Sequence, residues 1–185
     1  MLERMAVSYA TYERVALEDG DGTWELVCGR LREKQGMTQE HNNRGSRLAA
    51  QLFRQLDEDE FQIRLNAPAL RVREGTYFVP DVVVIPVSVP TAGARATSLE
   101  MYQRPLPLVV EVWSPSTGQR DLETKVPEYQ FRGDQEIWRI HPVEREVMVW
   151  RRASDGSYTE SQYSTGTVAL DSLPGVTIDL DRLFG

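Results

Sequence analysis

Three charged residues lie in apolar surroundings that would normally exclude them, and together they could carry out metal-assisted hydrolysis. Asp81 immediately precedes the apolar run 82–85, and Glu111 lies inside the apolar run 108–113. An ionised carboxylate among buried strand residues is costly unless a cation, a hydrogen-bond network or a raised pKa compensates. If the two strands are neighbours, both carboxylates can share a divalent metal, and such hard oxygen ligands suit Mg²⁺ or Mn²⁺. The third residue is Lys125, fourteen positions after Glu111.

A simpler interpretation of the same residues stays open. Carboxylates at strand ends are often exposed at the edge of a sheet, and Asp81 would then only shape a turn. Lys125 could pair with Asp121 one helical turn earlier, an arrangement worth only about 0.2–0.5 kcal/mol. Pro127 weakens this second interpretation, because proline is tolerated only in the first turn of a helix, which could therefore begin after Asp121.

Length and composition bound the class of protein. The 185 residues fit one domain, and 41% hydrophobic and 26% charged residues are typical of a folded globular chain. The apolar runs are far shorter than the roughly 20 residues of a membrane-spanning helix, and the first residues lack the apolar core of a signal peptide. We therefore expect a cytoplasmic protein without membrane contact. One cysteine and two histidines exclude a thiolate cluster and a multi-histidine metal centre, and we expect Cys28 to be a buried small hydrophobe.

The charge pattern narrows the possible partners. A net charge of −7 argues against a general nucleic-acid coat protein, which is normally basic. It does not exclude a nuclease, because carboxylates around a metal raise the acidic count while local arginines still meet phosphates. Only two of the 21 basic residues are lysines, Lys34 and Lys125. Because the chain uses arginine almost everywhere else, each lysine is a candidate for a specific role.

The hydrophobic pattern predicts helices and strands that could position these residues. It indicates a helix over 8–19 capped by Ser8, and a hairpin over 23–28 and 30–35 hinged at Gly29. The strongest helix begins near Thr38 and ends at the acidic run 57–60, with a buried stripe of Leu48, Ala49, Leu52, Phe53 and Leu56.

Most of the remaining chain reads as strands. They are expected at 61–66, 69–73, 77–85, 108–112, 136–140, 145–151 and 158–163, with a short strand and turn within 175–183. A second helix lies within 119–132, and residues 86–106 read as a long loop. This order predicts an α/β (α+β) fold in which helices flank a mixed central β-sheet.

Several linked motifs resemble one known family. The segments Pro80-Asp81, Glu111-Val-Trp-Ser-Pro-Ser-Thr117 and Arg120-Asp121 with Lys125 and Tyr129 are similar to the PD-(D/E)XK nuclease superfamily, and most closely to its restriction-endonuclease-like Uma2 branch. Further family motifs are matched by Trp24-Glu-Leu-Val-Cys-Gly29, His41, Glu136-Ile-Trp-Arg-Ile-His-Pro142 and Leu173-Pro-Gly175. The resemblance covers nearly the whole chain, and the linked set is more specific than any single motif.

The resemblance implies a restriction-endonuclease-like core and metal-dependent hydrolysis of DNA phosphodiester bonds. Asp81 and Glu111, with the backbone carbonyl of Val112, would bind Mg²⁺, for which Mn²⁺ could substitute. The superfamily's usual lysine stands two residues after the acidic ligand, where this chain has Trp113. Lys125 would be the migrated equivalent, activating water or stabilising the transition state.

Other residues could assist this site. The auxiliary candidates are Glu40, His41, Asp121 and Tyr129. A histidine at a helix end is more often a hydrogen-bonding residue, and an aromatic residue at this spacing is more often part of the core. Candidates for phosphate contact in DNA are Arg44, Arg47, Arg120 and Arg132, against the alternative that each lies on a solvated helix face.

The resemblance also implies a domain organisation. We expect one nuclease-like domain, with residues 1–37 as an N-terminal helix and hairpin, 38–142 as the catalytic core and 143–185 as C-terminal strands. A homodimer is expected, because restriction-like nucleases that cut both strands often work as pairs. Two residues depart from the family pattern, His141 in place of the usual aspartate and Pro127 in the lysine helix, where it could shift Lys125.

Two other classes of protein remain open. The main alternative is a non-catalytic nuclease-fold protein that binds DNA or another protein. A general β-rich interaction domain is the third, and in such a domain the carboxylates of Asp81 and Glu111 would not converge.

Overall fold

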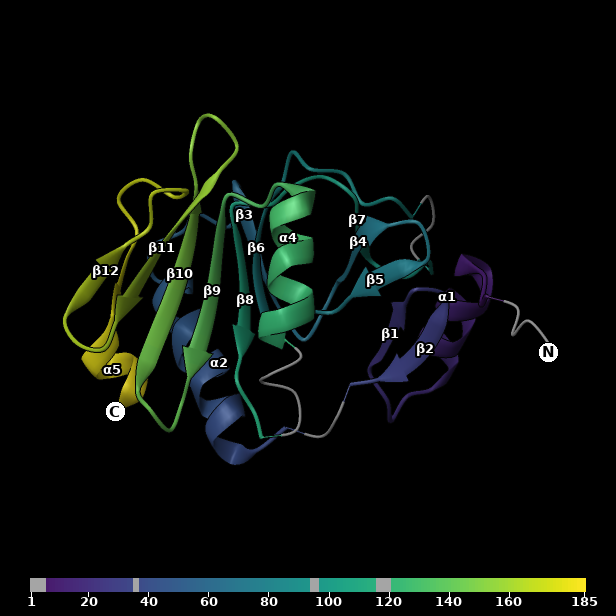
Figure 1. Ribbon diagram of the computed structural model, residues 1–185, viewed down its shortest axis with the longest axis horizontal. Coiled ribbons are helices and arrows are strands. Elements are labelled where there is room, and N and C mark those ends of the chain that lie inside the picture. The colour runs from purple at the N-terminus through teal and green to yellow at the C-terminus, as the bar shows by residue number, and fades with distance from the viewer. Residues whose placement is uncertain (1–5, 35–36, 94–96, 116–120) are drawn as a thin grey trace.

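The protein contains two main β-sheets that pack against each other (Figure 1). The computed structural model describes residues 6–34, 37–93, 97–115 and 121–185. The larger sheet comprises β3 (Phe61–Leu65), β6 (Val82–Pro86), β8 (Leu108–Val112), β9 (Glu136–His141), β10 (Glu146–Arg152) and β11 (Tyr158–Tyr163). The smaller sheet comprises β1 (Trp24–Val27), β2 (Arg30–Glu33), β4 (Ala69–Arg73), β5 (Thr76–Phe78) and β7 (Met101–Tyr102).

The larger sheet is mixed and lies between helices. Its strand order is β11-β10-β9-β8-β6-β3, in which β8 and β9 are parallel and the other neighbours are antiparallel. Helix α2 (Gln39–Phe53) packs on one face, and α4 (Val126–Arg132) packs on the other (Figure 1). This arrangement confirms the predicted mixed sheet flanked by helices. In the described ranges, no helix combines the length and the apolar character that crossing a bilayer requires.

The central strands explain the unbroken apolar runs in the sequence. In β6, Val82 and Val84 face the core under α2, whereas Val83 and Ile85 face the core under α4. Strand β8 divides its valines between the same two cores, and Glu111 alternates onto the α4 face with Val109. Because both faces are covered, these strands need apolar residues at nearly every position.

Local signals fix the ends of several elements. The Ser8 hydroxyl accepts the N–H of Thr11 at the start of α1 (Tyr9–Glu18), and the Thr38 hydroxyl caps α2 in the same way. Strands β1 and β2 form the predicted hairpin, in the smaller sheet of order β2-β1-β5-β4-β7. Its two-residue turn has positive φ at Cys28 (50°) and Gly29 (71°), the backbone that matches the twist of paired strands.

Two predictions about the strands were wrong. The stretch 77–85 is not one strand, because residues 79–81 carry the chain from β5 in the smaller sheet to β6 in the larger. The long loop 86–106 contains β7, which pairs in parallel with β4. The pattern also missed β12 (Thr167–Ala169), which pairs with β13 (Thr177–Asp179) before the closing helix α5 (Leu180–Phe184).

Two predictions about burial were also wrong. Cys28 is exposed, because it occupies the tip of the hairpin and not a strand interior. Phe53 is 59% exposed, because it is the last residue of α2 and lies about 100° around the helix from buried Leu52. Leu48, Ala49 and Leu52 form the buried stripe as predicted, with Leu56 partly buried against them.

Candidate functional site

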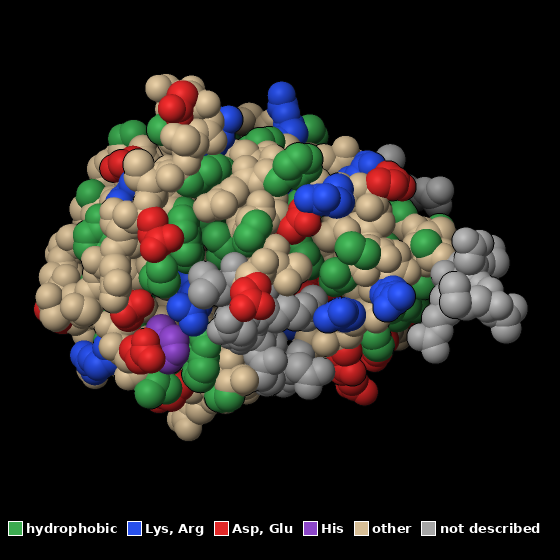
Figure 2. All heavy atoms as spheres, viewed as in Figure 1, with side chains coloured by type: hydrophobic (Ala, Val, Ile, Leu, Met, Phe, Trp, Pro, Cys, Tyr) green, Lys and Arg blue, Asp and Glu red, His purple; other side chains and the backbone are tan. Residues whose placement is uncertain are grey.

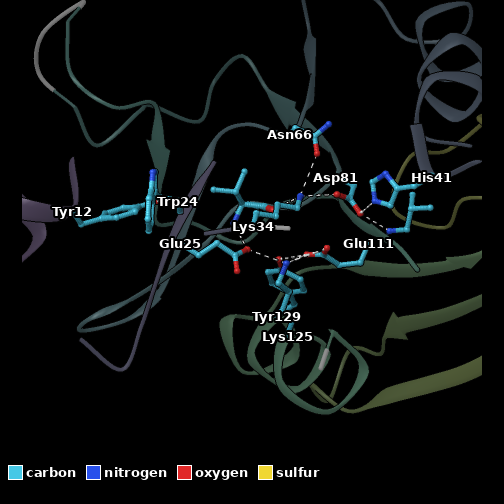
Figure 3. Close-up of polar contacts among 12 residues, drawn as sticks. Tyr12, Trp24, Glu25, Lys34, His41, Asn66, Asp81, Glu111, Lys125 and Tyr129 are labelled. Atoms are coloured by element: carbon cyan, nitrogen blue, oxygen red, sulfur yellow. Dashed lines mark hydrogen bonds and ion pairs between the residues drawn. The ribbon is translucent and has the colours of Figure 1, made fainter. Parts of the chain in front are cut away.

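The two predicted carboxylates meet where the sheets join. Strands β6 and β8 are antiparallel neighbours with Val82 opposite Val110, and continuing this register by one residue places Asp81 opposite Glu111. The Asp81 N–H donates to the Val110 carbonyl at 3.1 Å, which holds Asp81 at the edge of the ladder. Figure 3 shows both side chains within one polar cluster. Neighbouring strands are the arrangement that a shared metal would require.

Asp81 is buried and both of its carboxylate oxygens are engaged. Its Oδ1 lies 2.6 Å from the Lys34 ammonium. Its Oδ2 lies 2.9 Å from His41 Nε2 and accepts the backbone N–H of Val112 at 2.6 Å. Burial alone would raise the pKa of Asp81, but the Lys34 charge and the His41 hydrogen bond hold this pKa well below its ordinary value. Asp81 is therefore held as a carboxylate in a site where it is 3% exposed.

Glu111 belongs to the same cluster through a different lysine. The Lys125 ammonium lies 3.1 and 3.2 Å from the two Glu111 oxygens, and the Tyr129 hydroxyl donates to Oε1 at 2.7 Å. Lys125 also lies 2.9 Å from Glu25 Oε1, which accepts the Val79 N–H at 3.0 Å. Burial tends to raise the pKa of Glu25, but Lys125 outweighs this effect and lowers it. One ammonium thus bridges two buried carboxylates.

Local helix geometry places Lys125. It is the last residue of a π-helical turn, η1 (Asp121–Lys125), and it directly precedes α4. Pro127 lies in the first turn of α4, the position at which a helix tolerates proline best, and α4 continues beyond it to Arg132. The Lys125 ammonium also lies 5.7 Å from the centre of the Phe78 ring. Single π turns often occur at functional positions, because they redirect one side chain within a helix.

Sequence reasoning missed two residues of this cluster, Glu25 and Lys34. Both come from the stretch 1–37, which we expected to be an extension of the catalytic core. A usable signal existed for Lys34, because it is one of only two lysines in the chain and both lie in this cluster. Glu25 also had a signal, since it lies between apolar Trp24 and Leu26 in the family-like Trp24-Glu-Leu-Val segment.

The other auxiliary candidates lie in varied surroundings. Glu40 is 54% exposed at its side chain and pairs with Arg44. The side chain of Asp121 lies outside the described residues. Val112, whose carbonyl was predicted to bind the metal, contacts Asp81 through its backbone N–H. His141, the departure from the family pattern, stacks on Trp113 with ring centres 4.2 Å apart.

The arginines proposed for phosphate contact also differ. Arg44 is buried, donates to the Leu183 carbonyl at 3.0 Å, and lies over the Phe184 ring. Arg132 is buried against Asp134 and the carbonyl of Arg104. Arg47 is exposed and donates to the Arg182 carbonyl at 3.3 Å. Arg120 lies outside the described residues. On the face seen in Figure 2, acidic and basic side chains of the described residues are interspersed.

The oxygen atoms around Lys34 are of a kind that could bind a hard divalent cation. They are carboxylate, backbone carbonyl and amide oxygens, the ligand types that Mg²⁺ prefers. Within the described ranges, no group of three or more His, Cys, Asp or Glu residues is arranged to hold a metal by itself. Lys34 and Lys125 instead supply positive charge beside the buried carboxylates of Glu25, Asp81 and Glu111. The residues therefore fit a divalent ion by chemistry, in a cluster that already contains two internal cations.

The molecule thus combines a mixed sheet flanked by helices with buried carboxylates and a lysine at one end of its neighbouring strands β6 and β8. The sequence model of the Uma2 family, described as "Putative restriction endonuclease", matches residues 9–181, and the chain belongs to this family. This finding confirms the resemblance that the linked motifs indicated.

A solved structure supports the same fold. It is described as a "putative nuclease belonging to DUF820 from Anabaena variabilis ATCC 29413" and is similar to this chain with a TM-score of 0.74. The alignment covers 92% of this chain and 94% of that chain at 16% sequence identity, so the likeness shows the fold alone. No curated protein matches the chain.

Proposed function

We propose that the protein is a metal-dependent endonuclease that hydrolyses DNA phosphodiester bonds. The observation that carries this proposal is the buried cluster in which Asp81, Glu111 and Lys125 meet at one end of the neighbouring strands β6 and β8, in a chain of the Uma2 family. Structural ion pairs seldom gather three buried carboxylates in one place, because each added charge raises the cost of burial.

Asp81, Glu111 and the Val112 carbonyl are the groups proposed to hold Mg²⁺, with Mn²⁺ as a substitute. Bound there, the ion would neutralise charge on the scissile phosphate and acidify a water molecule. The protein's own contacts prepare the two acids for this task. His41 and the Val112 N–H orient Asp81, and Tyr129 orients Glu111.

Lys125 is the residue proposed to place a positive charge beside the reacting phosphate. Its ammonium, held between Glu111 and Glu25, would orient the attacking water or stabilise the added negative charge of the phosphate in the transition state. Among the four arginines predicted to contact phosphate, Arg44 and Arg132 are buried and Arg47 is exposed, so Arg47 stays a candidate for contact with the DNA backbone. A homodimer would allow both strands to be cut, and light scattering measures whether it forms.

Cleavage of supercoiled and linear DNA by the purified chain with Mg²⁺ or Mn²⁺ tests the proposal. Asp81→Asn and Glu111→Gln should each lower the rate by roughly 10³-fold or more, because each removes a proposed metal ligand. Glu58→Gln, which removes an exposed carboxylate, should leave the rate unchanged. Full activity of Asp81→Asn would contradict the proposed site.

One observation favours the alternative of a non-catalytic nuclease-fold protein. Asp81 and Glu111 are each paired with a lysine, so the fold can compensate their charge without a metal. That alternative predicts DNA or protein binding without cleavage, and binding that tolerates Lys125→Ala and Glu111→Gln. Metal-dependent cleavage that both substitutions abolish would exclude it.

A further inference from the structure

Lys34 occupies a position built from oxygen atoms. Its ammonium lies 2.6 Å from Asp81 Oδ1, 2.8 Å from the Val79 carbonyl and 3.2 Å from Asn66 Oδ1 (Figure 3). A carboxylate, a backbone carbonyl and a side-chain amide are ligand types that proteins use for hard divalent cations. Val79 and Asp81 lie in the segment that joins the two sheets, and Asn66 follows β3, so this position forms where the sheets meet.

The backbone around these oxygens is held in place. Asn66 follows β3 with a positive φ of 49°, and its N–H donates to the Asp81 carbonyl at 2.9 Å. Val79 lies in the segment that joins the two sheets, and its N–H is bound to Glu25 Oε1 at 3.0 Å. The backbone of Asn66 and of Val79 is thus positioned by contacts that do not involve Lys34.

Lys34 itself is attached in a way that allows it to leave. It follows β2, which is the edge strand of the smaller sheet, and it reaches Asp81 through a flexible four-carbon stem. Its side chain is nevertheless only 5% exposed, so the ammonium fills the position in this structure. Lys125, by contrast, is held between two carboxylates beside a helix start.

We propose that the position held by Lys34 is a divalent cation site whose ligands are Asp81, the Val79 carbonyl and the Asn66 side chain, and that the metal binds by displacing the Lys34 ammonium. The inference rests on the proposed metal dependence and adds two ligands and a built-in competitor to it. A divalent ion at this position would bring two positive charges to the Asp81 carboxylate. Retaining the Lys34 ammonium at the same three oxygens would place two cations side by side, and their repulsion is costly in a buried site.

Direct Mn²⁺ binding, measured by calorimetry and electron paramagnetic resonance without DNA, tests displacement. Lys34→Met keeps much of the stem but removes the competing charge, so it should tighten Mn²⁺ binding by roughly tenfold or more. Lys34→Gln should do the same, and it serves as the second variant if Lys34→Met folds poorly. Arg30→Met removes one positive charge from an exposed position of β2, and should change the affinity less than twofold.

The site of binding is tested in the Lys34→Met background. Adding Asp81→Asn should abolish the tight Mn²⁺ binding, and adding Asn66→Ala should weaken it severalfold. Wild-type affinity that equals that of Lys34→Met and Lys34→Gln would overturn displacement. Tight binding that survives Asp81→Asn would place the metal elsewhere and overturn the site.

These outcomes separate the inference from the proposed function. Binding that depends on Asp81 and Glu111 but is indifferent to Lys34 would refute only the displacement and leave the metal-dependent nuclease intact. Absence of Mn²⁺ binding in the wild type and in both Lys34 variants would refute both.

Discussion

Two buried sets of ion pairs in this molecule use different cations. At the junction of the sheets, Lys34 and Lys125 compensate Glu25, Asp81 and Glu111, and we call this set the lysine cluster. Near the start of β9, Arg132 pairs with Asp134 and Arg151 pairs with Glu136, and we call this set the arginine pairs. Every lysine of the chain lies in the first set, whereas the other 19 basic residues are arginines.

The arginine pairs connect chain segments. Arg132 joins Asp134 to the Arg104 carbonyl, and Asp134 also accepts the Leu106 N–H at 2.7 Å. Glu136 accepts the Trp138 indole N–H at 2.9 Å, in addition to its contact with Arg151. A planar guanidinium fits several fixed acceptors at once, so such a pair stabilises one geometry.

The lysine cluster differs in the kind of cation that faces its carboxylates. An ammonium is a compact point charge on a flexible stem, so it can move away from a carboxylate when another cation arrives. We infer from this comparison that the arginine pairs maintain the fold, whereas the lysine cluster can exchange an ammonium for another cation. Each prediction below changes one set and measures both stability and site chemistry.

The largest effect is expected from breaking an arginine pair. Arg132→Met leaves the Asp134 charge buried without its cation and should lower the free energy of unfolding by about 3–5 kcal/mol. Urea denaturation measures this change, with exposed Arg30→Met as the control. Arg132→Lys keeps the charge but loses the fork, and should fall between the two. Weaker Mn²⁺ binding by folded Arg132→Met would contradict the distinction between the two sets, because the Arg132–Asp134 pair would then influence the metal site.

Substitution of Lys125 should affect chemistry more than metal binding. Lys125→Met removes the ammonium next to Glu111, and DNA cleavage per folded molecule should fall roughly 10²–10³-fold, as for other lost transition-state donors. Because Asp81 and Glu111 remain, Mn²⁺ should still bind, which calorimetry measures. An unchanged cleavage rate would show that Lys125 has only a structural role, like the arginines of the arginine pairs.

The central acids of the site could be predicted from sequence because their neighbours are apolar. Asp81 and Glu111 adjoin runs that only a two-sided buried strand explains, and this local conflict marks them as unusual. Lys125 stood out by its rarity and by its place in a linked set of motifs. The mixed sheet followed from the order and the composition of the same runs.

The same signals, apolar neighbours for Glu25 and rarity for Lys34, were present but did not place these two residues in the site. Their roles depend on contacts with Lys125 and Asp81, which lie 100 and 47 positions further along the chain. Such pairing is set by how the smaller sheet packs on the larger, and no local periodicity encodes it. The prediction of a single strand over 77–85 was wrong for the same reason. Only the arrangement of the two sheets shows why the chain leaves one sheet and enters the other near Pro80.

Two buried or partly buried tyrosines allow a matched test of the lysine cluster and the arginine pairs, with effects of intermediate size expected. The Tyr129 hydroxyl donates to Glu111 at 2.7 Å, and the Tyr158 hydroxyl donates to the Asp134 backbone carbonyl at 2.6 Å. Tyr129→Phe removes a hydrogen bond to a charged group, worth about 1.5–3 kcal/mol, and should lower the cleavage rate about tenfold. Tyr158→Phe should reduce the free energy of unfolding by about 1 kcal/mol without changing cleavage. Equal effects on cleavage would argue against a special role for the lysine cluster.

The smallest effect concerns acid stability, for which Asp81 of the lysine cluster and Asp134 of the arginine pairs have opposite signs. Burial raises the pKa of Asp81, but Lys34, His41 and Lys125 together bring it below its ordinary value. The unfolded chain then binds more protons than the folded protein near pH 4, so Asp81 stabilises the fold above its unfolded pKa and this contribution is lost as the pH falls. Burial also raises the pKa of Asp134, and there Arg132 and the Leu106 N–H do not offset it. Between its ordinary and its raised pKa, Asp134 therefore favours folding more strongly as the pH falls.

Urea denaturation at pH 6 and pH 4 distinguishes these signs. Asp81→Asn should lose less stability than the wild type between the two values, because the acid-sensitive contribution is already absent. Asp134→Asn should lose more, because it removes the group that opposes acid destabilisation. Each difference is at most about 1.4 kcal/mol per pH unit, the free energy of one proton per titrating group. If both variants shifted in the same direction, the carboxylates would respond to burial alone, and the distinction between lysine and arginine partners would not govern their charge.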